Sequence, residues 1–203
     1  GDMLYLPPGV PHHGVAVDAC LTFSIGMRAP SQAELTGDLA DHIAEQLPEE
    51  LRYTDPDLKP AKAAGEIDSA AIDRLRDSLP FAAALDDAML RDWFGRFITR
   101  YRNAQVAVAR DKPLTAAALA KQLEDGVQLL RHPWSRLAWG RSKSACTLYV
   151  SGQAYPSTQG MAQQLCAHRA FQVTGHLTAV EQALLVELVN DGHLLPSKAK
   201  RRR

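Results

Sequence analysis

The first 27 residues read as three short strands, and strands this short are stable only within a larger sheet. Leu4–Leu6 is an apolar run that stops at the turn Pro7-Pro8-Gly9, and strands follow at about His12–Val17 and Cys20–Met27. A hairpin on its own is marginally stable in water. We therefore expect this chain to be the C-terminal part of a longer protein whose earlier strands complete the sheet.

His12 lies where the second strand begins, directly after the rigid turn. A histidine held there is well placed to bind a metal ion, because imidazole is the commonest metal ligand in proteins. The adjacent His13 faces the other side of the strand, so the two cannot bind one ion from the same face without a bulge. Residues 1–14 alone leave two interpretations of His12 open, a metal ligand and a solvated side chain.

The third strand, Cys20–Met27, alternates between bulky and small side chains. Its bulky apolar residues, such as Phe23, share one face, whereas Thr22 and Ser24 lie on the other. A small polar face leaves room for a ligand inside a barrel, although a half-solvated antiparallel sheet gives the same alternation. If the hairpin places His12 on the face of Thr22, the histidine lines that interior.

The composition excludes several classes of protein. The chain has 23 basic and 23 acidic residues, so no net charge favours nucleic acid or an anionic membrane. No apolar run approaches the roughly 20 residues of a membrane span. Cys20, Cys146 and Cys166 are odd in number and widely spaced, which disfavours disulfides and zinc ribbons and favours a reducing cytoplasm. Phosphate-binding loops, HExxH and GxSxG are absent from the sequence.

Residues 31–112 carry helix signals. The residues that start or stop the expected helices are Ser31 with Glu34 as a capping box, Pro48, Asp68 or Ser69, and Pro80. A third helix, from about Asp86 to Arg102, has a broad apolar face made by Leu90, Trp93, Phe94, Phe97, Ile98 and Tyr101. Such faces, following an incomplete sheet, predict a helical bundle shared by two copies of the chain.

Residues 113–197 mix short helices and strands, which favours a winged-helix arrangement. Helices are expected from Thr115, from about Ser157 and from Thr178, which forms a capping box with Glu181. The expected strands are Val127–Leu130, Arg136–Trp139, Cys146–Val150, Phe171–Val173 and His193–Leu195. The basic tail, residues 198–203, reads either as a solvated terminus or as a contact to RNA phosphates.

Two segments carry a resemblance to a known family. Residues 1–14, GDMLYLPPGVPHHG, and residues 24–30, SIGMRAP, closely resemble the end of the catalytic domain of bacterial ribosomal oxygenases, which are JmjC/cupin-type enzymes. PPG-x-PH alone is shared with other cupins, and the pair of segments is more specific. Residues 92–98, DWFGRFI, resemble the last helix of the family's dimerisation region.

The resemblance implies an α+β chain in four parts. Residues 1–30 would be the terminal strands of a JmjC/cupin double-stranded β-helix, and residues 31–112 a helical dimerisation region. Residues 113–197 would be a winged-helix-like domain, and residues 198–203 a basic tail.

The resemblance also implies chemistry. His12 matches the third ligand of Fe(II), and Thr22 and Ser24 match positions near the 2-oxoglutarate pocket. The family couples decarboxylation of 2-oxoglutarate to hydroxylation of a side chain, in its bacterial branch an arginine, in a large-subunit ribosomal protein. A cytoplasmic homodimer is expected.

The chain also departs from the family. It has neither the β-helix core, nor the His-x-Asp or His-x-Glu pair that supplies the other two ligands, nor the basic clamp for the cosubstrate. We therefore expect the fragment alone to be inactive. Two alternatives stay open: a non-catalytic dimerisation and winged-helix module that contacts RNA, and another metal-dependent cupin such as an isomerase.

Overall fold

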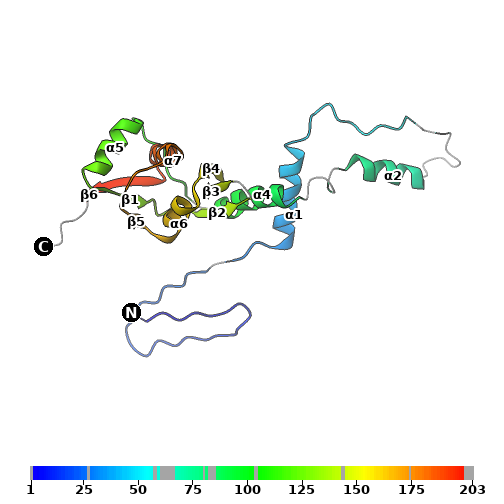
Figure 1. Ribbon diagram of the computed structural model, residues 1–203. Coiled ribbons are helices and arrows are strands. Elements are labelled where there is room, and N and C mark those ends of the chain that lie inside the picture. Colours follow the sequence, from blue (N-terminus) through cyan, green and yellow to red (C-terminus); the bar gives the residue numbers. More distant parts are fainter. Residues whose placement is uncertain are drawn as a thin grey trace. The chain divides into compact units, whose positions relative to one another are not determined.

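A computed structural model describes residues 2–26, 28–56, 59, 67–79, 81, 86–102, 105–142, 145–173 and 175–198. The chain divides into two units, Gly1–Pro30 and Ser31–Arg203, shown in Figure 1. The predicted basic tail lies outside the described residues, apart from Lys198.

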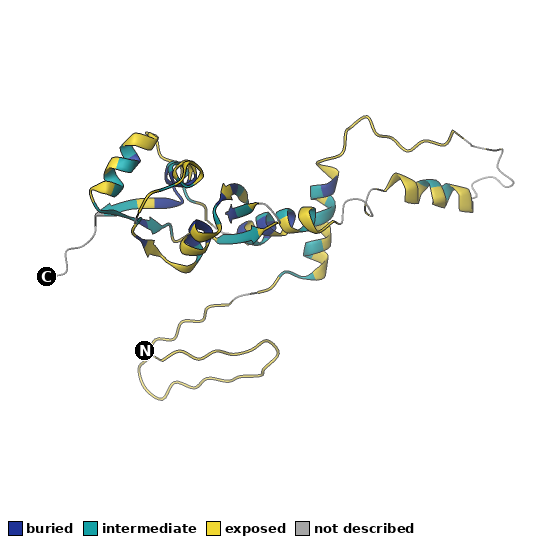
Figure 2. Ribbon diagram, viewed as in Figure 1, coloured by how far each residue is buried: buried dark blue, intermediate teal, exposed yellow. Residues whose placement is uncertain are grey.

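The first unit has no helix or strand among its described residues, which corrects the strands predicted at Leu4–Leu6, His12–Val17 and Cys20–Met27; Met27 itself lies outside the described residues. Every side chain from residue 2 to residue 26 is exposed, as the yellow trace in Figure 2 shows. The physical reason is the lack of a partner: strands of this length need a neighbouring sheet to receive their hydrogen bonds and cover their apolar face. Residues 2–26 pair with no such sheet.

The second unit begins with helices whose caps agree with the prediction. Helix α1 spans Gln32–Ala44 and starts with a complete capping box, in which the Ser31 hydroxyl accepts from the Glu34 N–H and the Glu34 carboxylate accepts from the Ser31 N–H. Helix α2 spans Ser69–Ser78, and Asp68 caps it. Helix α4 spans Asp87–Arg100, where the Asp86 carboxylate accepts from two backbone N–H groups.

The C-terminal part contains a first antiparallel sheet. Its strands are β1 (Val127–Arg131), β5 (Ala170–Phe171) and β6 (Leu194–Lys198), in the order β5-β1-β6. Leu129 pairs with Phe171 on one side and with Pro196 on the other. Helix α5 (Ala116–Glu124) begins at the predicted cap Thr115, and α7 (Ala179–Asn190) begins at the predicted capping box of Thr178 and Glu181.

A second antiparallel sheet follows the order β2-β3-β4, with β2 at Leu137–Arg141, β3 at Cys146–Val150 and β4 at Gln153–Ser157. Ser151 and Gly152, both with positive φ, turn the chain between β3 and β4. Helix α6 (Gln159–Ala167) follows.

Helix α4 packs against this second sheet, although it precedes the segment predicted as the winged-helix domain. Gly95 allows this packing, because a β-carbon there would clash with the Tyr149 ring.

The core of the second unit joins both sheets to α5, α6 and α7. Its fully buried members include Leu119, Leu129, Leu148, Leu165, Leu185 and Leu188. Figure 2 colours these buried residues dark blue, together with buried residues of α1 and α4 that lie outside this core. No helix within the described ranges is long and apolar enough to cross a membrane.

Candidate functional site

The turn before His12 shapes the candidate metal-binding segment. The Val10 N–H donates to the Pro7 carbonyl at 3.4 Å, and Gly9 adopts φ +78° within this turn. The His12 Nδ1 lies 3.1 Å from the Val10 carbonyl oxygen. A carbonyl only accepts, so Nδ1 is the donor in this contact, and Nε2 is the ring nitrogen that can offer a lone pair to a metal ion. Metal-binding histidines commonly have this arrangement, in which the second ring nitrogen donates to a carbonyl.

Thr22 and Ser24 lie in the same unit as His12, and all three are exposed. No strand pairing brings them onto a common face within residues 2–26, so their roles remain predictions. Groups of three histidine, cysteine or acidic side chains able to hold a metal ion are not found among the described residues. His12 therefore fits one position of a metal site, and the described chain does not complete the set.

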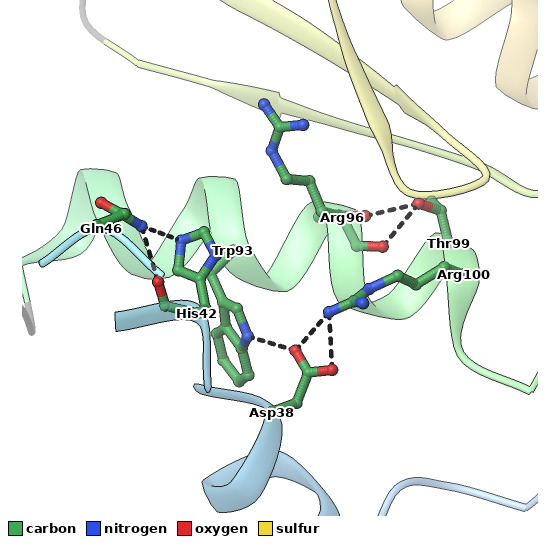
Figure 3. Close-up of polar contacts among 8 residues, drawn as sticks. Asp38, His42, Gln46, Trp93, Arg96, Thr99 and Arg100 are labelled. Atoms are coloured by element: carbon green, nitrogen blue, oxygen red, sulfur yellow. Dashed lines mark hydrogen bonds and ion pairs between the residues drawn. The ribbon is translucent and has the colours of Figure 1, made fainter. Parts of the chain in front are cut away.

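A polar junction between α1 and α4, not predicted from the sequence, lies in the helical region. Asp38 accepts from the Trp93 indole N–H at 2.9 Å and from Arg100 through both oxygens at 2.7 Å, and these contacts are drawn in Figure 3. The Trp93 ring is buried and stacks on Phe97 with ring centroids 5.6 Å apart. Asp38 thus ties α1 to α4.

Glu34 forms a second tie between the same segments. Besides capping α1, its carboxylate accepts from Arg102 at 2.9 Å and from the Tyr101 hydroxyl at 3.1 Å. The Ser31 backbone N–H and the Arg102 guanidinium lower the pKa of Glu34 to about 2. These bonds hold an ionised carboxylate at a helix junction, and none of them prepares a group for catalysis.

An open groove of about 570 Å³ lies between α4 and strands β2 and β3. Apolar and aromatic side chains dominate its wall, namely Leu90, Trp93, Phe94, Ile98, Trp139 and Tyr149. Asp87 and Arg91 are its charged members, and burial raises the pKa of Tyr149. This lining suits an apolar side chain and provides no nucleophile beside a base.

Other reactive side chains of the second unit have structural roles. Burial raises the pKa values of the Cys146 and Cys166 thiols, which opposes thiolate formation. His193 is buried against Ser135 with 2.8 Å between Nδ1 and Oγ, and burial lowers its pKa.

Two family models match the sequence. Residues 75–195 match the ROXA-like winged helix, which is more than half of the chain, and residues 1–35 match the JmjC domain. Both assignments agree with the resemblance found in the sequence.

Two curated relatives share this sequence pattern. The ribosomal protein uL16 3-hydroxylase of Escherichia coli (strain K12) is 27% identical over 198 residues, which are 95% of this chain and 52% of the relative. A protein named "probable ribosomal oxygenase", from Haemophilus influenzae, is 34% identical over 94 residues, covering 42% of this chain and 23% of the relative. The chain thus spans about half the length of the first relative and less of the second.

Solved structures of Escherichia coli YcfD share the fold. An X-ray structure has a TM-score of 0.66 at 23% identity and covers 84% of this chain and 46% of that chain. A structure described as a ribosomal oxygenase in complex with cobalt and 2-oxoglutarate has a TM-score of 0.65 at 24% identity, covering 83% and 47%. At these identities the likeness supports the fold alone.

Proposed function

Because this chain belongs to the ROXA-like winged helix family, we propose that it is the C-terminal part of an Fe(II)- and 2-oxoglutarate-dependent oxygenase that hydroxylates a ribosomal protein. The observation that carries this proposal is the uL16 3-hydroxylase relative, which aligns with 95% of the chain. The JmjC match over residues 1–35 supports it, because this segment contains His12.

His12 would hold the iron through Nε2, while its Nδ1–H donates to the Val10 carbonyl and fixes the ring. Thr22 and Ser24 would lie beside the 2-oxoglutarate. The bound metal and cosubstrate would supply the oxidative chemistry that couples decarboxylation to hydroxylation. Two further ligands, expected as His-x-Asp or His-x-Glu, would come from outside residues 1–203, so the chain alone would be inactive.

The proposed substrate is a large-subunit ribosomal protein of the uL16 type, which the first relative's name specifies. An arginine side chain would be the target. We place the protein in the cytoplasm, where its substrate is made.

We also propose a homodimer through residues 31–112. Helix α2 supports this because its two large apolar side chains are exposed: Ile72 is 38% exposed and Leu75 is 47% exposed.

The first test is the DNA that precedes residue 1. It should encode His-x-Asp or His-x-Glu in the same reading frame, and a frame without either motif would contradict the proposal.

The second test measures decarboxylation of 2-oxoglutarate and the mass of the ribosomal protein after incubation with the whole protein. His12→Ala should reduce both signals to the level without iron. His13→Ala, a matched control one residue away, should retain them. Turnover of His12→Ala at the wild-type level would reject the ligand assignment.

The alternative function is a non-catalytic dimerisation and winged-helix module. It is favoured by one observation, that the buried core of the described chain lies entirely within Ser31–Arg203. It predicts a folded dimer without metal, and a whole protein that does not decarboxylate 2-oxoglutarate would support it.

A further inference from the structure

A long stretch of the winged-helix domain carries only positive charge. From Gly126 to Val180 the sequence has no aspartate or glutamate, while it has five basic residues, Arg131, Arg136, Arg141, Lys143 and Arg169. The whole chain has 23 basic and 23 acidic residues, so the rest of the chain has 18 basic and 23 acidic residues, a net charge of −5. The zero net charge is therefore the sum of a positive stretch and a negative remainder.

The arginines of this stretch also differ in their partners from those of the helical region. In the helical region carboxylates pair with several arginines, as Arg76–Asp73, Arg96–Asp92, Arg100–Asp38 and Arg102–Glu34, although Arg52 donates to backbone carbonyls. Within the described residues, the arginines of the basic stretch form no such pair. Arg131 and Arg136 donate to backbone carbonyls, and Arg141 donates to an amide oxygen. These neutral acceptors leave the positive charge uncompensated.

Several of these groups meet at one end of the first sheet, which we call the β1-end patch: Arg131, His132, Trp134, His168 and Arg169. The Arg131 N–H donates to the Arg169 carbonyl at 2.7 Å, which brings the two arginines together. The Arg131 guanidinium donates to the Cys166 carbonyl at the end of α6, next to the helix cap His168. Figure 1 shows β1, β5 and α6 as neighbours.

The patch also presents an aromatic ring. Trp134 is 44% exposed, and its ring forms a T-shaped contact with the His132 ring, with centroids 5.1 Å apart and an interplanar angle of 69°. One carboxylate, that of Asp191, lies near this end of the sheet. Asp191 is two residues before His193, and the His193 carbonyl accepts a hydrogen bond from the His132 N–H. Asp191 accepts a hydrogen bond from the Tyr155 hydroxyl at 3.0 Å.

We propose that the β1-end patch binds single-stranded RNA, with its arginines on phosphates and a base stacked on Trp134. Phosphate groups match uncompensated guanidinium charge, and every base has a face that can stack on an exposed aromatic ring. An acidic peptide would use the arginines but would not need the tryptophan. This inference is independent of His12 and of the oxygenase proposal.

The patch is separate from the basic tail that the sequence analysis connected with RNA. Strand β6 runs antiparallel to β1, so Leu194 pairs with Arg131 and Lys198 pairs with Val127. Lys198, the first residue of the tail, therefore lies at the opposite end of β1 from Arg131, about 13 Å away along the strand. Removing residues 199–203 and changing the patch are thus distinct perturbations.

The experiment measures fluorescence anisotropy of a labelled oligouridine of about 12 nucleotides with the 203-residue chain at low salt. We expect binding that weakens as salt rises. Arg169→Glu should weaken it about tenfold, whereas Arg76→Glu, the same charge change on α2, should have less than about a twofold effect. Trp134→Ala should weaken it about tenfold, and Phe94→Ala, which removes a ring of equal exposure, should not.

Circular dichroism of each variant verifies that it is folded, and a variant that is not is replaced by Arg169→Gln or Trp134→Leu. Absent binding at low salt would overturn the proposal. Equal losses for Arg169→Glu and Arg76→Glu would overturn it as well, because they would indicate a general charge effect. Loss of binding only on removal of residues 199–203 would assign it to the tail. Tighter binding to polyglutamate than to RNA, unaffected by Trp134→Ala, would identify an acidic peptide as the ligand.

Discussion

Residues 2–26 and residues 115–198 differ in the burial of their apolar side chains. In the first segment Leu21, Phe23 and Ile25 are 83%, 83% and 89% exposed. In the second segment Leu129 and Leu185 are 0% exposed, inside a core shared by two sheets and three helices. The segment with the sharpest sequence motif thus adds nothing to the core, whereas the segment with ordinary sequence patterns builds it.

This difference separates stability from function along the chain. Among the described residues nothing covers the bulky face of residues 20–26, which fits the proposal that this segment belongs to a larger sheet. The proposed metal ligand belongs to this exposed segment. Stability should therefore depend on the second unit, while iron binding should depend on residues that hardly affect unfolding.

The largest expected difference, in the free energy of unfolding, is between substitutions of a core leucine and of an exposed isoleucine. Leu185→Ala should lower the free energy of unfolding by about 2–5 kcal/mol, because it leaves a cavity in the core. Ile25→Ala should change it by less than about 0.5 kcal/mol. Urea unfolding of both variants measures these changes. A loss of stability of similar size for Ile25→Ala would contradict the difference between the two segments, because it would show that residues 2–26 pack against other residues.

A smaller effect is expected from two helical glycines. Gly95→Ala should destabilise the chain by about 1–3 kcal/mol, because the new methyl group meets the Tyr149 ring. Gly37→Ala, in α1, meets no atom within 4 Å and should stabilise by about 0.5–1 kcal/mol through helix propensity. Thermal unfolding of the two variants extends the comparison to two sites within the second unit. Equal shifts in melting temperature would contradict the packing of α4 on the second sheet.

The smallest effect concerns Glu34 and pH. Its pKa of about 2 in the folded chain lies below the ordinary value of 4.5, owing to the Ser31 N–H and Arg102. Its contribution is therefore fully present above pH 4.5 and is lost as the pH falls through about 2. Urea midpoints between these pH values should fall more steeply for the wild type than for Glu34→Gln. Parallel slopes would show that the α1 junction does not hold an ionised Glu34.

Local signals predicted much of the second unit. Ser31, Asp68, Thr115 and Thr178 begin helices as expected, because a cap needs only neighbouring residues. Strand β4 was missed, since Gln153–Ser157 includes Pro156 and lacks a clear apolar run.

Contacts between residues far apart in the sequence could not be predicted from local patterns. Asp38 and Trp93 are 55 residues apart, and their hydrogen bond depends on how α1 crosses α4. The strands predicted in residues 3–27 failed for the related reason that their alternation requires a sheet to face. His12 was identified by its motif, and its exposed position in this chain gives it no partner but the Val10 carbonyl among the described residues.

The most direct test of the central claim is the iron content of the whole protein, prepared without oxygen, for the wild type, His12→Ala and His13→Ala. We predict that His12→Ala loses bound iron while its urea unfolding midpoint, measured for iron-free protein, equals that of the iron-free wild type, and that His13→Ala keeps its iron. Full iron content in folded His12→Ala would contradict the claim that the exposed N-terminal segment supplies a metal ligand.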